Sequence, residues 1–280
     1  MRTDASPQAA DSPLRAEDAT IGYDNRVISE ELSVEIPADS FTVIVGPNAC
    51  GKSTLLRALA RLLKPHHGQV VLDGRAIDSF GAKEVGRRLG LLPQSSLAPD
   101  GITVADLVAR GRHPHQGFLR QWSRTDEEAV AGAMEATGVT ELSARPVDEL
   151  SGGQRQRVWI SLVLAQQTPL MLLDEPTTFL DITHQIDLME LLTDLHEDGR
   201  TLVAVLHDLN QAARYATHMI AMRDGQIVSS GSPSEILTAE LVHEVFGLDC
   251  IVVEDPIVGT PSVVPRGRKR VRPRGVAQIG

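Results

Sequence analysis

Short, strongly apolar runs alternate along this chain with longer segments whose apolar residues recur at helical spacing. The runs 41–45, 170–173 and 201–206 are rich in valine, isoleucine or leucine, and a glycine or polar residue follows each. Such runs are typical of buried strands. The segments after Lys52 and around 186–195 carry the spacing of amphipathic helices. This succession predicts an open, mostly parallel α/β sheet in which polar residues at the strand ends border a ligand crevice.

Residues 95–166 depart from this alternation. They carry helical patterns but no convincing strand, which predicts an inserted helical lobe. The patterns lie at 104–110, 125–137 and 153–166.

Period-two alternation elsewhere predicts an added antiparallel layer. It occurs at 19–36, at 69–72 and in a hairpin pattern at 219–229 around the turn pair Asp224-Gly225. After Pro233 the sequence predicts only a short helix to Phe246, followed by segments rich in valine and proline.

Composition fits a globular protein with a sizeable core, because 42% of the 280 residues are apolar and 23% are charged. The net charge is −10, yet six cations lie in the last fifteen residues, so the remainder of the chain carries roughly −16. We therefore exclude nucleic acid as a partner of the body and assign no function to the basic tail. The six cations are Arg266, Arg268, Lys269, Arg270, Arg272 and Arg274.

The sequence favours a reducing, cytoplasmic setting. Of its two cysteines, Cys50 lies in a glycine-rich loop where a disulfide would obstruct a ligand. Neither Cys50 nor Cys250 has the sequence features of a catalytic cysteine. Residues 1–15 lack the apolar stretch of a secretory signal. No segment reaches the ~20 apolar residues that a membrane span needs. Any membrane role is therefore expected to depend on a partner.

A phosphate-binding loop follows the first apolar run. Residues 46–53 fit the pattern G-x-x-x-x-G-K-S between a predicted strand and a predicted helix. Backbone N–H groups of such a loop surround the phosphates of a nucleotide, the lysine neutralises their charge, and the serine hydroxyl binds Mg²⁺. The predicted nucleotide-binding residues are Gly46, Pro47, Asn48, Ala49, Cys50, Gly51, Lys52, Ser53 and Thr54.

Two carboxylates and a histidine follow the next two apolar runs. Asp174 closes a hydrophobic strand, where a carboxylate is costly unless it meets a cation such as Mg²⁺. Glu175 can polarise a water for attack on the γ-phosphorus, which is the task of a general base. His207 follows the run 201–206 and can donate a hydrogen bond to the γ-phosphate.

A second glycine pair opens a later helix, in the segment Leu-Ser-Gly-Gly-Gln at 150–154. A helix N-terminus of this kind binds anions, so the sequence predicts a triphosphate held from two sides. The residues of this second site are Ser151, Gly152, Gly153 and Gln154.

Taken in order, these motifs together with Gln94 and the loop 178–181 resemble the ATP-binding subunits of ABC transporters over residues 16–232. The resemblance implies a P-loop NTPase core, with residues 1–15 as a disordered tail and 233–280 as a C-terminal extension. It also implies that the 151–154 loop of one copy binds the γ-phosphate on the phosphate loop of a second copy, so that two ATP molecules lie in a head-to-tail dimer.

The resemblance gives three further residues a role. Gln94 would contact Mg²⁺ or the attacking water, Asp181 would lie at the dimer seam, and Tyr23 would stack on adenine, with an ordinary strand tyrosine as the alternative. Many members have glycine where this loop has Ala49, which leaves the local geometry open.

The segment 111–116, followed by Trp122 and 125–126, is similar to ATPases that power uptake of ferric siderophores, haem or cobalamin. In that group the lobe docks on a permease at the cytoplasmic face of the membrane, an extracytoplasmic binding protein delivers the cargo, and these residues would lie near the docking surface. His113 and His115 lack a third ligand nearby, so we expect no metal site there.

Two other classes remain as alternatives. A soluble ABC-type ATPase acting on ribosomes or DNA usually has two cassettes or long heptad arms, and neither is present in this sequence. A nucleotide sensor without hydrolysis is disfavoured because Glu175 and His207 are both present.

Overall fold

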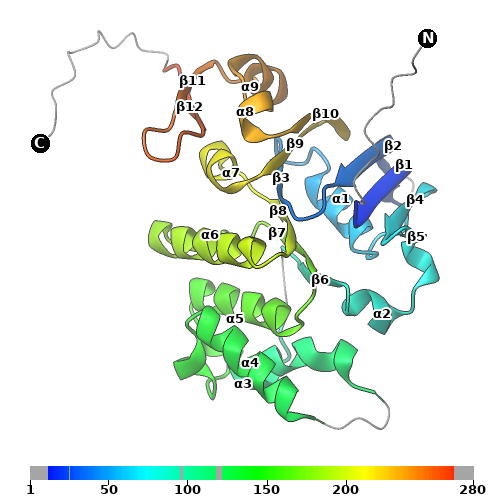
Figure 1. The fold of residues 1–280 in the computed structure, drawn as a ribbon, viewed down its shortest axis with the longest axis vertical. Coiled ribbons are helices and arrows are strands. Elements are labelled where there is room, and N and C mark those ends of the chain that lie inside the picture. Colours follow the sequence, from blue (N-terminus) through cyan, green and yellow to red (C-terminus); the bar gives the residue numbers. More distant parts are fainter. Residues whose placement is uncertain (1–11, 25, 95–96, 118–121, 268–280) are drawn as a thin grey trace, which may run out of the picture.

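A six-stranded sheet forms the centre of the computed structural model, which describes residues 12–24, 26–94, 97–117 and 122–267 (Figure 1). Its strand order is β10-β9-β3-β8-β7-β6, and all neighbours are parallel except the β9–β10 hairpin. The three apolar runs of the sequence form β3, β7 and β8, which are buried throughout. The strands are β3 (Phe41–Val45), β6 (Leu89–Leu92), β7 (Leu170–Asp174), β8 (Thr201–Val205), β9 (His218–Arg223) and β10 (Gln226–Gly231).

Both faces of this sheet are covered, because successive side chains of a strand point to opposite sides. Phe41 and Val43 of β3 enter one hydrophobic cluster, whereas Ile44 enters the other. The first cluster includes α6 and α7, and the second includes α1. This arrangement confirms the predicted α/β core. The helices are α1 (Lys52–Leu59), α6 (Ile182–Glu197) and α7 (Leu209–Tyr215).

A second sheet of four antiparallel strands, in the order β2-β1-β4-β5, forms the predicted antiparallel layer. Its first strand begins at Leu14, whose side chain is fully buried against this layer. The predicted tail at 1–15 therefore extends too far, although residues 1–11 lie outside the described part of the chain. The strands are β1 (Leu14–Tyr23), β2 (Arg26–Ile36), β4 (His67–Leu72) and β5 (Arg75–Ala76).

The hairpin predicted at 219–229 forms, but it joins the central sheet and not the antiparallel layer. Its strand β9 pairs in parallel with β3, and both faces of β9 are buried. Met219 lies in one hydrophobic cluster and Met222 in the other. Residues 219–222 of this strand are all apolar and need cover on both faces of the sheet. The assignment to the antiparallel layer was wrong, because the apolar run outweighs the hairpin pattern.

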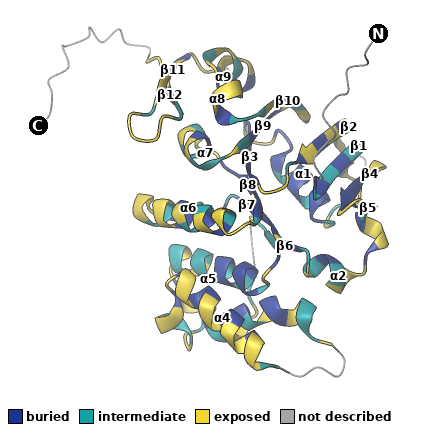
Figure 2. Cartoon of the chain, in the orientation of Figure 1, coloured by how far each residue is buried: buried dark blue, intermediate teal, exposed yellow. Residues whose placement is uncertain are grey.

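Helices dominate the segment between β6 and β7 and form a lobe beside the core (Figure 1). The three principal helices lie within two residues of the predicted ranges. Figure 2 shows that α4 is exposed along its outer side. The elements are α3 (Val104–Ala109), η2 (Arg110–His115), α4 (Arg124–Ala136), η3 (Thr140–Leu142), η4 (Val147–Glu149) and α5 (Gly152–Ala165). Before β6 lie η1 (Ile77–Ser79) and α2 (Ala82–Gly86).

The C-terminal extension contains a hairpin that the sequence did not predict. It follows α8 (Pro233–Ile236) and α9 (Ala239–Phe246), and consists of β11 (Cys250–Glu254) and β12 (Pro261–Pro265). The Asn210 side chain on α7 binds both the N–H and the carbonyl of Val263, which fixes the hairpin to the core. The tail cations from Arg268 onward lie outside the described residues. No helix in the described ranges is long and apolar enough to cross a bilayer.

Candidate functional site

The phosphate loop joins β3 to α1 and surrounds the ammonium of Lys52. The buried Lys52 Nζ donates to the carbonyls of Gly46 and Pro47, each at 2.8 Å. Burial lowers the pKa of Lys52 below its usual range, with nearby acids acting in the opposite direction. Ala49 adopts a φ of +61°, so the loop keeps the left-handed turn at a residue other than glycine.

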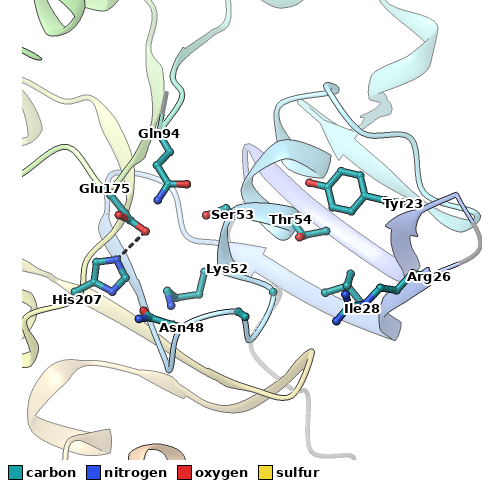
Figure 3. Close-up of a pocket in the computed structure, with 12 residues that line it drawn as sticks. Tyr23, Arg26, Ile28, Asn48, Lys52, Ser53, Thr54, Gln94, Glu175 and His207 are labelled. Carbon is teal, nitrogen blue, oxygen red and sulfur yellow. Dashed lines mark ion pairs between the residues drawn. The ribbon is translucent and has the colours of Figure 1, made fainter. Parts of the chain in front are cut away.

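A pocket of about 650 Å³ opens in front of this loop, and the labelled side chains in Figure 3 point into it from several elements. Its lining includes the predicted Tyr23, Gln94, Glu175 and His207 together with much of the loop. The lining residues are Tyr23, Arg26, Ile28, Asn48, Ala49, Gly51, Lys52, Ser53, Thr54, Gln94, Glu175 and His207. Residues far apart in the sequence therefore meet at one concave surface.

Asp174 and Ser53 bring two oxygen atoms together beside the phosphate loop. The Ser53 hydroxyl donates to Asp174 Oδ1 at 2.9 Å. Burial of Asp174, only 2% exposed, raises the pKa of its carboxyl, and the hydrogen bond from Ser53 partly offsets this. Hydroxyl and carboxylate oxygens are ligands that Mg²⁺ accepts, usually with phosphate and water oxygens completing its shell. The donor set therefore fits Mg²⁺.

Glu175 and His207 lie beyond the carboxyl ends of β7 and β8 and face each other. Because β7 and β8 are neighbours in the sheet, the residues that follow them are adjacent, and His207 Nε2 lies 2.7 Å from Glu175 Oε1 (Figure 3). Thr178 donates to the other oxygen of Glu175 at 3.3 Å. The Glu175 side chain is 13% exposed and that of His207 is 46% exposed. A carboxylate held in this way is positioned to accept a proton from a water in the pocket.

Tyr23 forms the outer wall of the pocket, where its hydroxyl accepts a hydrogen bond from Arg57 Nη1 at 3.1 Å. Sequence reasoning missed two residues beside it, Arg26 and Ile28. The alternation of β2 could have identified them together, because residues two apart on a strand, such as Arg26 and Ile28, share a face. The exposed ring of Tyr23 leaves an aromatic surface available for stacking.

The 151–154 loop opens α5 outside the lining of the phosphate pocket. Ser151 accepts from the N–H of Gln154, and the Gln154 side chain accepts from the N–H of Ser151, which forms a capping box. None of these four described residues lines the phosphate pocket of its own chain. Gly152 instead lines a second cavity of about 510 Å³, bordered also by Gln94, Trp159 and Phe179.

Asp181 lies at the N-terminus of α6 and does not line the phosphate pocket of its own chain. Its side chain accepts from the N–H of His184 at 3.0 Å and from the imidazole at 2.8 Å. The backbone hydrogen bond from His184 is the main cause that lowers the pKa of Asp181. In the single chain this carboxylate therefore caps a helix.

The segment 111–116, which we expect near a docking surface, has a charged residue inside the lobe. Arg112 is 3% exposed and pairs with Asp126, which is 2% exposed, at 2.9 Å. Arg112 also donates to the carbonyl of Ala165 and the side chain of Gln167. The two charges lie inside the lobe and compensate each other, because a buried cation and anion must be paired. His113 and Trp122 remain exposed.

His115 likewise turns inward, and its Nε2 lies 2.8 Å from the carbonyl of Gln166. Within the described residues, no group of three or more His, Cys, Asp or Glu side chains is placed to hold a metal ion. A magnesium site at Ser53 and Asp174 does not need such a group, since Mg²⁺ keeps waters and phosphate oxygens as ligands.

Comparison with known proteins adds to this geometry. Residues 29–178 match the family model described as ABC transporter. The chain is 60% identical to the ferric enterobactin transport ATP-binding protein FepC of Escherichia coli (strain K12), over 91% of this chain and 94% of that protein. It is 50% identical to the petrobactin import ATP-binding protein FpuD of Bacillus anthracis, over 92% and 96%. The dimeric structure of a bacterial ABC transporter cassette superposes with a TM-score of 0.71 at 26% identity, covering 78% of this chain and 98% of that one.

Proposed function

Because this chain belongs to the family of ABC transporter ATP-binding subunits, we propose that it hydrolyses ATP at the Lys52 pocket to drive uptake of a ferric siderophore through a membrane permease. The observation that carries the catalytic part is the Glu175–His207 pair, 2.7 Å apart, facing the phosphate loop. A general base beside a phosphate-binding loop suits in-line hydrolysis, in which positioning and charge provide most of the catalysis.

In the proposed reaction Glu175 accepts a proton from the attacking water. The water oxygen bonds to the γ-phosphorus while the bond from that phosphorus to the bridging oxygen breaks, which yields ADP and phosphate. Lys52 and the loop N–H groups hold the phosphates, and His207 donates to a γ-phosphate oxygen. Mg²⁺, held by Ser53 and Asp174 with Gln94 nearby, would neutralise phosphate charge. Tyr23 would stack on adenine.

The second part of the proposal is a head-to-tail dimer. Ser151, Gly152 and Gly153 open a helix whose N-terminus suits an anion, yet none of them lines the phosphate pocket of its own chain. A second copy can bring these residues to the γ-phosphate held by Lys52, with Asp181 at the seam. The solved ABC transporter cassette compared above is dimeric, which supports a dimer of this chain.

The cargo and partners form the third part. The relatives cited are named for transport of ferric enterobactin and petrobactin, and their identity with this chain extends over more than nine-tenths of its length. We therefore favour a ferric siderophore over haem or cobalamin. The partner would be a permease, which the subunit would contact at the cytoplasmic face of the membrane, with an extracytoplasmic binding protein supplying the cargo.

The hydrolysis proposal is tested by comparing ATP turnover of the wild type with Glu175→Gln and the control Glu127→Gln on the exposed side of α4. Loss of a general base lowers the rate by about 10²–10⁴-fold, so Glu175→Gln should lose turnover to that extent while still binding ATP. Glu127→Gln should match the wild type. Equal rates in all three proteins would refute the assignment of Glu175.

Glu175→Gln also allows the dimer to be tested, because it should accumulate with ATP bound. Light scattering should then show a dimer with ATP, and Ser151→Asp in the same background should remain monomeric because its carboxylate repels the γ-phosphate. A monomer in both cases, in solution and in the permease complex, would contradict the shared site.

For the cargo, a deletion strain is grown under iron limitation with ferric siderophores, haem or cobalamin supplied separately. We expect siderophore-dependent growth to be lost and to return with the wild-type gene. Unchanged uptake of all three would remove the transport assignment.

A further inference from the structure

The turn between β9 and β10 contacts the phosphate loop at Cys50, a residue that does not line the pocket. Its second residue, Gly225, donates its backbone N–H to the carbonyl of Cys50 at 2.9 Å. Cys50 directly precedes Gly51, which lines the nucleotide pocket. The contact therefore lies one peptide away from the surface that faces the phosphates.

This hydrogen bond fixes the direction of one peptide plane. In a planar trans peptide the carbonyl and the following N–H point in opposite directions. When the Cys50 carbonyl is held toward Gly225, the Gly51 N–H is directed away from the turn, and Gly51 itself lines the pocket. That N–H is among the donors that a phosphate loop offers to an anion.

The packing around Gly225 leaves no space for a side chain. A Cβ at this position would collide with the carbonyl oxygen of Ile28, a residue of β2 that also lines the pocket. Gly51 packs against the same residue, since a Cβ built on it would lie 3.2 Å from Ile28 Cγ2 and 3.7 Å from the Cα of Gly225. Three segments thus meet closely: β2, the phosphate loop and the β9–β10 turn.

From these contacts we infer that Gly225 is a positioning residue for the nucleotide phosphates, acting through the Cys50–Gly51 peptide. This inference rests on the ATP binding in the proposed function and adds a residue outside the loop that determines how the loop presents its donors. Gly225 itself does not line the pocket.

The chain provides a matched control for this inference. The turn between β4 and β5 has the same residues, Asp73-Gly74, and nearly the same geometry: φ is +75° at Gly74 and +80° at Gly225. A Cβ on Gly74, however, would meet no atom within 4 Å. Gly74→Ala and Gly225→Ala therefore carry the same turn strain, and only the second displaces the contact with Ile28 and the loop.

The test measures dissociation constants for ATP and for inorganic tripolyphosphate by calorimetry, on Gly225→Ala, Gly74→Ala and the wild type. Gly225→Ala should weaken both ligands by the same factor, at least about tenfold, because the loss is in phosphate contacts. It should also raise the KM for ATP more than it changes kcat. Gly74→Ala should stay within about twofold of the wild type.

A third variant guards against loss of folding. Asparagine tolerates the left-handed region better than alanine, so Gly225→Asn keeps the turn but still collides with Ile28. If either Gly225 variant folds and binds tripolyphosphate like Gly74→Ala, the inference is wrong, and the proposed ATPase function still stands through wild-type turnover. Failure of the wild type to bind or hydrolyse ATP would instead reject the proposed function.

Discussion

The buried Arg112–Asp126 pair should be the most sensitive charged contact of the lobe. Arg112→Met keeps much of the side-chain length but removes the donors to Asp126, Ala165 and Gln167. Removing one partner of a buried pair costs about 3–5 kcal/mol, because the other charge is left uncompensated. Ser123 still donates to Asp126 through its hydroxyl and its N–H, so we expect a loss near the lower end, about 3 kcal/mol.

The control for this prediction is Arg124→Met at the start of α4, the helix that carries Asp126. Arg124 pairs with Glu128 at the same 2.9 Å, but the two side chains are 90% and 64% exposed. Exposed pairs of this kind contribute about 0–1 kcal/mol. Arg112 differs from Arg124 in its burial and in its further hydrogen bonds to Ala165 and Gln167. The difference between the two substitutions therefore measures the effect of burial together with those two bonds.

The assay is urea unfolding followed by tryptophan fluorescence, which reports on the lobe because both tryptophans of the chain, Trp122 and Trp159, belong to it. In the double variant Arg112→Met/Asp126→Ala, the free energy of unfolding should be lowered by less than the sum of the two single losses. A loss for Arg112→Met as small as that for Arg124→Met would refute the reasoning.

Three further predictions follow from the site and the lobe. The Asp126 pKa is lowered to about 2 by hydrogen bonds from Ser123 and Arg112; its contribution to stability is therefore present above the unfolded value near 3.8 and is lost as pH falls through about 2. Stability of the wild type relative to Asp126→Asn, measured against pH, should be constant from pH 7 to pH 5, and a decline over that interval would contradict this. Tyr23→Ala should weaken ATP by roughly 1–3 kcal/mol but leave tripolyphosphate unchanged, whereas Tyr215→Ala, remote from the pocket, should leave both unchanged in calorimetry. Ser53→Ala should raise the Mg²⁺ concentration needed for half-maximal turnover by at least about tenfold, the size of one hydrogen bond or ligand contact to a charged group; an unchanged magnesium titration would show that Ser53 is not a ligand.

The sequence predicted those parts of the fold that depend on short-range patterns. The apolar runs located β3, β7 and β8, and the fact that Glu175 and His207 follow two of them predicted their place at the crevice. Motif spacing located the phosphate loop, because a loop between a strand and a helix is contiguous in the chain.

Features that depend on strand order and long-range pairing escaped prediction. β6 has only four residues and contains Gly90, so its pattern is too short to distinguish a strand from a loop. The contact of Gly225 with Cys50 exists because β9 lies beside β3, although these strands are more than 170 residues apart. Likewise, nothing in the local sequence shows that Arg112 turns inward to Asp126 and does not reach solvent.

Because Ser151 does not line the Lys52 pocket of its own chain, the activity left in a mixed dimer should depend on how two mutations are distributed between the two co-expressed genes. Under the proposed shared occupancy, one polypeptide without Lys52 and another without Ser151 place both defects in the same half of a mixed pair and spare the other half. The two defects in a single polypeptide, paired with an intact copy, spoil both halves. A cis–trans complementation experiment would thus distinguish two genotypes that contain the same mutations in the same numbers.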